Sequence, residues 1–129
     1  MPPDERFVHR TKNLNKALQA LKGSLADPVT EPRDLSGIIK DFEIVYELSW
    51  KTLKDFLEKQ GHETTSAKDV FSRAYQLGLL KQESVWYEMI NDRNLTVHTY
   101  DETLAGGMVE RIRTQYYSAF SSLLVLISK

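Results

Sequence analysis

The sequence contains no cysteine, which excludes disulfide frameworks and zinc sites with cysteine ligands. Long hydrophobic runs are also missing. The longest covers only residues 123–127, whereas a helix that spans a bilayer needs roughly 20 apolar residues. The first six residues lack the apolar segment of a secretory signal. We therefore expect a cytoplasmic protein that does not enter a membrane.

Charge of one sign is not in excess either. The net charge is −1, with 17 basic and 18 acidic residues mixed along the chain. A chain with this balance has no overall attraction for nucleic acid, so any contact with RNA or DNA must come from a local patch.

The patterns of several enzyme sites are absent from the chain. It has no glycine-rich phosphate loop, no pair of catalytic carboxylates and no nucleophile elbow. We expect neither a bound metal nor a cofactor.

The chain is rich in helical periodicity. With 129 residues, of which 41% are hydrophobic and 27% charged, it has the size and balance of one globular domain, and we treat 1–129 as a single unit. Apolar residues recur at helical spacing, and no stretch shows the sustained period-two alternation of a strand. We expect helices from Asp4 to about residue 27 and over residues 34–60, 66–78, 82–97 and 101–128.

The predicted fold class is all-α, an up-and-down four-helix bundle with one additional short helix. Three helix ends carry recognisable signals. Asp4 is a reasonable N-cap after two prolines, and Ser66 has the position of an N-cap for the short helix. Gly61 follows the second helix at the position where glycine is favoured.

The segment from Asn91 to Glu102 is the most unusual part of the sequence. On a helical wheel, Arg93 continues an apolar row that includes Trp86, at a position where leucine would be ordinary. An arginine there needs a partner or a solvent-filled groove. Asn94 and His98 lie one turn apart on the neighbouring polar row, so their side chains can touch.

This segment carries a short motif, in which an arginine is followed after four residues by a histidine and then by a tyrosine. The motif residues are Arg93, His98 and Tyr100, with Asn94 directly after the arginine. The motif stands at the head of the final helix, and the second helix is aromatic and acidic over residues 41–51. In these features the chain resembles the HEPN-domain toxins and nucleotidyltransferase substrate-binding proteins, in the branch with an R-x4-H-x-Y motif. The resemblance covers nearly the whole chain.

The resemblance implies a helical bundle that forms a homodimer, with two motifs meeting in a cleft at the interface. It implies a metal-independent endoribonuclease that cleaves RNA as the toxin of a toxin–antitoxin pair. A small nucleotidyltransferase would be the partner and would silence the toxin by transferring AMP to Tyr100. The chain itself lacks the acidic pattern of a nucleotidyltransferase, so that activity would belong to the partner.

The motif residues have chemistry that suits RNA cleavage. The guanidinium of Arg93 can bind and stabilise a phosphate, because it stays charged and donates in pairs. His98 can act as general acid or base near neutral pH. Asn94 would support them, either by a hydrogen bond to the phosphate or by fixing the tautomer of His98. Tyr100 would be both a component of the site and the modification target.

The spacing of the motif creates a geometric problem. Five residues along an ideal helix rotate by about 140°, so Arg93 and His98 would not share a face. Thr99 and Glu102 have the spacing of a capping box, which predicts a break just after His98. We expect both a break in the helix and a working pair drawn from opposite chains.

Each motif residue also has an ordinary structural interpretation. Arg93 can form an ion pair with Asp92, with Glu88 or with an acid on another helix. His98 can simply end a helix, and Tyr100 can be a core aromatic with its hydroxyl at the rim. For the whole protein, the alternatives are a non-catalytic substrate-binding or scaffold subunit of a nucleotidyltransferase, and a plain helical dimer without a ligand. The plain dimer predicts that Arg93 and His98 lie in separate local contacts.

Overall fold

The computed structural model describes residues 2–129, and this range consists of helices and turns without a strand. The elements, in chain order, are α1 (Pro3–Ala26), α2 (Pro32–Lys59), α3 (Ala67–Gln76), α4 (Glu83–Leu95), a 3-10 turn (Thr96–His98), α5 (Glu102–Arg111), a π turn (Ile112–Tyr116) and α6 (Tyr117–Ile127). The π turn joins α5 to α6 without a break, so these three elements form one final helix. The all-α prediction is confirmed.

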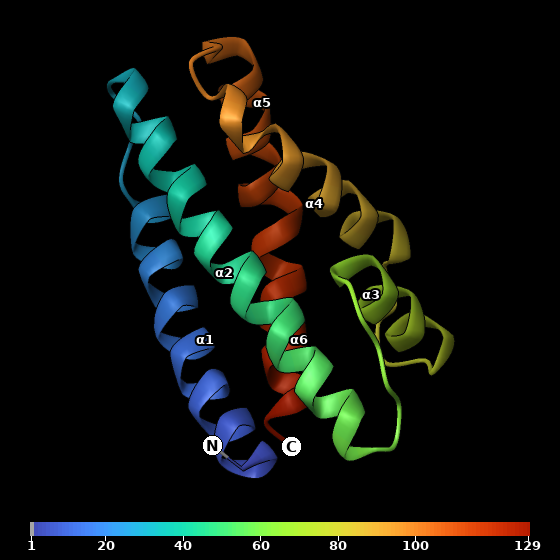
Figure 1. Cartoon of the computed structure of the whole chain (residues 1–129). Coiled ribbons are helices and arrows are strands. Elements are labelled where there is room, and N and C mark those ends of the chain that lie inside the picture. Colours follow the sequence, from blue (N-terminus) through green and yellow to red (C-terminus); the bar gives the residue numbers. More distant parts are fainter. Residues whose placement is uncertain (1) are drawn as a thin grey trace.

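The four long helices form the predicted bundle, and α3 is the additional short helix. α1 and α2 lie side by side, and the final helix packs against both (Figure 1). α3 contacts α2 and α4. The turn between α4 and α5, orange in Figure 1, lies at the end of the bundle opposite the beginning of α1 and the C-terminus. Within residues 2–129, no helix is long and apolar enough to cross a membrane.

The helix ends show where sequence signals succeeded and where they failed. The start at Asp4 was wrong, because α1 begins at Pro3, and proline is favoured at the first helical position. α2 begins at Pro32, before the predicted residue 34, because Glu31 and Asp34 form a reciprocal capping box. Gly61 has a φ of 87° directly after α2, as its predicted position requires.

The core is built around aromatic rings from four helices. Phe42 of α2 stacks on Tyr116 with ring centroids 5.5 Å apart, and Phe120 meets the edge of Trp86 at 5.8 Å. Trp86 also contacts Phe71 of α3 at 4.8 Å. These contacts tie α3 and α4 to the long helices, and they hold the end of α4 in a fixed direction.

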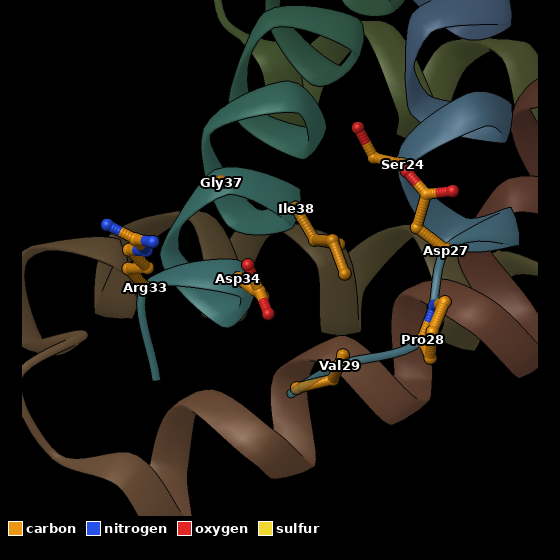
Figure 2. Close-up of a pocket in the computed structure, with 8 residues that line it drawn as sticks. All are labelled: Ser24, Asp27, Pro28, Val29, Arg33, Asp34, Gly37 and Ile38. Carbon is orange, nitrogen blue, oxygen red and sulfur yellow. The ribbon is translucent and has the colours of Figure 1, made fainter. Parts of the chain in front are cut away.

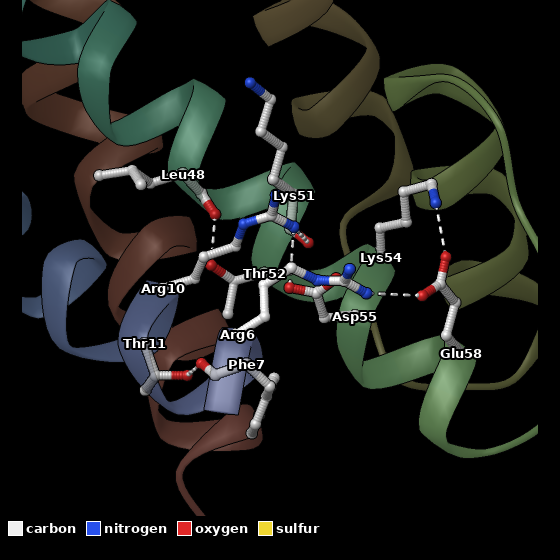
Figure 3. Close-up of polar contacts among 10 residues, drawn as sticks. All are labelled: Arg6, Phe7, Arg10, Thr11, Leu48, Lys51, Thr52, Lys54, Asp55 and Glu58. Carbon is white, nitrogen blue, oxygen red and sulfur yellow. Dashed lines mark hydrogen bonds and ion pairs between the residues drawn. The ribbon is translucent and has the colours of Figure 1, made fainter. Parts of the chain in front are cut away.

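A charged cluster joins α1 to α2 (Figure 3). Asp55 is only 3% exposed, and it accepts hydrogen bonds from Arg6 Nε at 3.1 Å and from Arg10 Nη1 at 2.8 Å. Glu58 pairs with Lys54 at 2.6 Å, and that hydrogen bond lowers the pKa of the Glu58 carboxyl. Every charge of this cluster has a partner, so we interpret it as a structural link between the two helices.

Candidate functional site

The motif segment folds as a helix end followed by a tight turn. α4 ends at Leu95 and the chain continues as the 3-10 turn, whereas the sequence predicted a regular helix as far as Val97. α5 then starts with Asp101 as its N-cap, whose carboxylate accepts the Leu104 N–H at 3.1 Å. The predicted break after His98 is therefore confirmed. The sequence suggested Thr99 as the capping residue, but the cap is Asp101.

Arg93 sits in the last turn of α4, where it is half-buried between two helices. Its Nε lies 3.5 Å from Oε1 of Glu47 on α2, and this contact is an ion pair without hydrogen-bond geometry. Its Nη1 donates to the hydroxyl of Thr96 at 3.4 Å. An ion pair with an acid on another helix was one of the structural interpretations of Arg93, and the structure shows it. Both contacts of Arg93, to Glu47 and to Thr96, are long. Its Nε is buried and has no hydrogen-bond acceptor within residues 2–129.

Glu47 was not singled out in the sequence, although the apolar row that contains Arg93 called for a partner acid on a neighbouring helix. Its Oε2 accepts the indole N–H of Trp50 at 3.2 Å and lies 3.8 Å from Nζ of Lys51. Burial raises the pKa of the adjacent Tyr46 to about 12, and the negative charge of Glu47 adds to the rise while Arg93 opposes it. Glu47 therefore stands between two cations beside a buried phenol.

His98 and Tyr100 meet at the exposed end of the bundle. His98 Nδ1 lies 3.1 Å from the Tyr100 hydroxyl, and the two rings meet edge to face at 5.7 Å. Tyr100 is 80% exposed, so its interpretation as a core aromatic was wrong. The neighbouring Val97 is 71% exposed. The tyrosine, not Asn94, is the partner that orients the imidazole in a single chain.

The remaining motif contacts are missing within one chain. Asn94 is exposed, and its side chain makes no hydrogen bond in the part of the chain that the structure describes. Across residues 2–129, neither a hydrogen bond nor an ion pair joins Arg93 to His98. The structure therefore brings His98 and Tyr100 together but leaves Arg93 in a separate contact, as the five-residue spacing predicted.

A buried cluster directly behind the motif was also missed in the sequence. Asp92 is 1% exposed and accepts Arg111 Nε and Nη2, each at 2.8 Å, and the Tyr116 hydroxyl at 2.5 Å. The hydrogen bonds to Asp92 raise the pKa of the Arg111 guanidinium, and burial raises the pKa of the Tyr116 hydroxyl. Asp92 is thus occupied by Arg111 and does not pair with Arg93.

The π turn explains how two residues five positions apart reach one carboxylate. In an α-helix, Arg111 and Tyr116 would point about 140° apart. The π turn widens the helix locally, and the Tyr117 N–H bonds to the Ile112 carbonyl, five residues back. Both side chains then face Asp92, and the cluster fixes the end of α4 against the final helix.

A pocket at the turn between α1 and α2 lies outside the motif (Figure 2). Two of its polar side chains, Asp34 and Ser24, already make local hydrogen bonds. Asp34 accepts the backbone N–H groups of Thr30 and Glu31 at 2.9 and 3.0 Å, and these bonds lower the pKa of its carboxyl. The Ser24 hydroxyl donates to Asp41. We therefore interpret this pocket as part of the turn that caps the start of α2, and not as a ligand site.

Sequence comparison links the chain to one family. The sequence model of a family described as nucleotidyltransferase substrate binding protein like matches residues 9–128. A curated relative from Haemophilus influenzae, named "probable ribonuclease HepT", is 35% identical over 83 residues. That match covers 60% of this chain and 57% of the relative, so the aligned part is little more than half of the relative's length.

Two solved structures share the fold over at least 90% of this chain. A protein from Thermus thermophilus superimposes with a TM-score of 0.83 at 34% identity, covering 90% of this chain and 99% of the other. A protein from Haemophilus influenzae superimposes with a TM-score of 0.82 at 27% identity, covering 92% and 99%. The second is described as revealing the fold of a substrate binding domain of a nucleotidyltransferase.

Proposed function

Because the chain belongs to the nucleotidyltransferase substrate binding protein like family, we propose that it is a HEPN-type, metal-independent endoribonuclease. It would act as the toxin of a toxin–antitoxin pair and be controlled by a partner nucleotidyltransferase. The observation that carries the proposal is the state of the motif side chains. Arg93 is held only by long contacts, and His98 is exposed with one ring nitrogen placed by Tyr100.

These side chains have distinct roles in RNA cleavage. A base removes the proton of the 2′-hydroxyl, the 2′-oxygen attacks the phosphorus, and an acid protonates the leaving 5′-oxygen. His98 serves as one of these proton carriers, because imidazole exchanges protons near neutral pH. Arg93 binds the phosphate and stabilises the charge that develops on it. Asn94, which is exposed and follows Arg93 in the chain, would donate its amide to the same phosphate.

The site is completed by a second copy of the chain. Each chain supplies one motif histidine, whereas the reaction needs both an acid and a base. The motif turn stands at one end of the bundle, with Val97 and Tyr100 largely exposed there. In a symmetric dimer through this end, the same surface of both chains would meet. Arg93 of one chain then lies beside His98 of the other.

The direct test is cleavage of RNA by the purified protein in EDTA. We expect the wild type to cleave and His98→Ala to lose activity by a factor of about 100 or more. His9→Ala is the matched control, because His9 is an exposed histidine on α1 outside the motif. Equal cleavage by the wild type and His98→Ala would eliminate the proposed role of His98.

Regulation through Tyr100 is part of the same proposal. The phenolic oxygen would attack the α-phosphorus of ATP in the partner enzyme, forming Tyr-O-AMP and releasing pyrophosphate and a proton. Tyr100 is 80% exposed in the single chain, and AMP on its hydroxyl would break the contact with His98. After incubation with the partner and ATP, we expect mass spectrometry to find AMP on the wild type and not on Tyr100→Phe.

A second candidate function is a non-catalytic subunit that holds the substrate of a nucleotidyltransferase. The description of the Haemophilus influenzae structure as a substrate binding domain favours it. Both candidates predict that the protein co-purifies with a nucleotidyltransferase, so co-purification does not separate them. Growth arrest when the chain is expressed alone, relieved by His98→Ala, supports the toxin. Absence of arrest, together with RNA binding without cleavage, supports the binding subunit.

A further inference from the structure

We propose that Glu47 is a positioning residue of the candidate ribonuclease site. Its carboxylate holds the guanidinium of Arg93 by the Nε edge and leaves the distal Nη nitrogens to an RNA phosphate. This inference rests on the proposed function and adds to it a residue on a different helix, 46 positions before Arg93 in the chain.

The contact geometry assigns Glu47 to one edge of the guanidinium. Oε1 of Glu47 lies 3.5 Å from Nε of Arg93, which is buried, whereas the arginine side chain as a whole is 36% exposed. Nη2 has no hydrogen-bond partner within residues 2–129, and unlike Nε it is not a buried atom, so this distal nitrogen is open to solvent. Nη1 has one weak acceptor, the Thr96 hydroxyl at 3.4 Å, which a phosphate oxygen can replace.

Glu47 is itself held in place from the other side. Its second oxygen, Oε2, accepts the Trp50 indole N–H at 3.2 Å and lies 3.8 Å from Nζ of Lys51. These contacts come from the same helix, three and four residues further on, so they require no other element to form. The carboxylate is thus anchored through Oε2 and turns Oε1 toward Arg93.

The arrangement has two opposite effects on RNA. Holding Arg93 in one orientation favours catalysis, because a misplaced phosphate ligand loses much of its effect on the transition state. The negative charge of Glu47 beside the phosphate position opposes binding of the substrate. Replacing Glu47 by glutamine removes the charge and weakens the hold on Arg93. Both kcat and KM should then fall, a combination that general destabilisation does not produce.

The experiment compares Glu47→Gln with Glu43→Gln in RNA cleavage. Glu43 lies one turn earlier on α2 and is also partly exposed, so its substitution makes the same charge change without the contact to Arg93. We expect Glu47→Gln to lower kcat about tenfold and to lower KM, while Glu43→Gln leaves kcat unchanged. In an Arg93→Ala background, Glu47→Gln should have no further effect on kcat, because it acts through Arg93.

A second measurement keeps this inference separate from the proposed ribonuclease activity. NMR of the arginine Nε–H groups reports the surroundings of Arg93 without any cleavage. We expect the Arg93 resonance to shift in Glu47→Gln and, by less, in Trp50→Phe, and to stay in place in Glu43→Gln. If the wild type does not cleave RNA but this resonance shifts, the proposed function fails and the hold of Glu47 on Arg93 stands. An unmoved resonance, or equal kcat losses in the Glu47→Gln and Glu43→Gln variants, overturns the inference.

Discussion

Asp92 and Arg93 are neighbours in the chain, yet each belongs to a different kind of ion pair. Asp92 is 1% exposed and binds Arg111 through two hydrogen bonds of 2.8 Å, with the Tyr116 hydroxyl as a third donor. In the second pair the acid is exposed as well: Glu47 is 39% exposed and lies 3.5 Å from Arg93. The two arginines are similarly exposed, Arg111 to 32% and Arg93 to 36%, so the acids make the difference. The first pair is closed and satisfied, whereas the second keeps donors free.

Under the proposed function, this one helix end would serve both stability and chemistry. A bidentate pair around a buried carboxylate strongly resists rearrangement, because separating it leaves an unpaired charge in the interior. A half-exposed pair with a long contact contributes little to stability and exchanges partners readily. The rigid cluster at Asp92 therefore holds the end of α4 in place. Arg93 lies next to it on the same helix end, with most of its hydrogen-bond donors unused.

The largest expected effect concerns activity at Arg93. We expect Arg93→Ala to lower RNA cleavage about 1000-fold, because the charge that develops on the phosphate loses its main stabilising group. The free energy of unfolding should change by less than about 1 kcal/mol, since the lost ion pair is half-exposed. Cleavage rates and urea unfolding of the same preparations measure both. A large loss of stability would mean that the Arg93 ion pair, like the Asp92 pair, mainly stabilises the fold.

The next effect concerns stability at Asp92. We expect Asp92→Ala to lower the free energy of unfolding by about 3 kcal/mol, because Arg111 and Tyr116 both lose their acceptor. Chemical denaturation measures the change. Glu47→Ala is the matched control, and it should cost less than about 1 kcal/mol. Similar losses in the two variants would remove the distinction between the two pairs.

The buried phenols predict sensitivity to alkali. Burial raises the pKa of Tyr46 to about 12 and that of Tyr116 further, from an ordinary value of 10.0. Folding therefore favours the protonated hydroxyls, and this contribution is complete below pH 10 and is lost as the pH rises above it. We expect the free energy of unfolding to fall above pH 10, and to fall less steeply in Tyr46→Phe. Tyr100→Phe, which removes an exposed hydroxyl, should keep the wild-type slope.

The smallest expected effect lies in the link between α1 and α2. The Lys54 hydrogen bond lowers the pKa of Glu58 from its ordinary value of 4.5, so the ionised carboxylate stabilises the fold. That contribution is present above this value and is lost as the pH falls through the lower folded pKa. At neutral pH, Glu58→Gln should cost a few tenths of a kcal/mol, about the size of an exposed helical ion pair. Denaturation at acid pH should show a smaller difference between the two proteins.

Much of the fold was predictable because its signals are local. Helical periodicity predicted the helices of the bundle. Gly61 predicted the end of α2, because glycine favours the backbone conformation found there. The break after His98 was also predicted from short-range capping, although Asp101 and not Thr99 supplies the cap. Asp101 has the extended backbone that an N-cap needs, whereas Thr99 has a helical backbone, and residue spacing alone does not show this difference.

The contacts between helices were less accessible from the sequence. The π turn that brings Arg111 and Tyr116 to Asp92 has no spacing signature, because an α-helical wheel places those two residues on different faces. The partner of Arg93 depends on how α2 and α4 pack, so the sequence predicted the need for an acid but did not identify Glu47. The proposed pairing of Arg93 with His98 would need a second chain, and it stays a prediction.

The most direct test of that pairing is cleavage by mixed dimers. One chain carries Arg93→Ala and the other His98→Ala, each with a different affinity tag, so that mixed dimers can be purified after co-expression. If the site takes Arg93 from one chain and His98 from the other, the mixed dimer keeps one such pair but only one of the two histidines. It should then cleave RNA faster than either parent variant, which keeps no such pair, and at less than half of the wild-type rate. Mixed dimers as inactive as the two parent variants would contradict a site shared between chains.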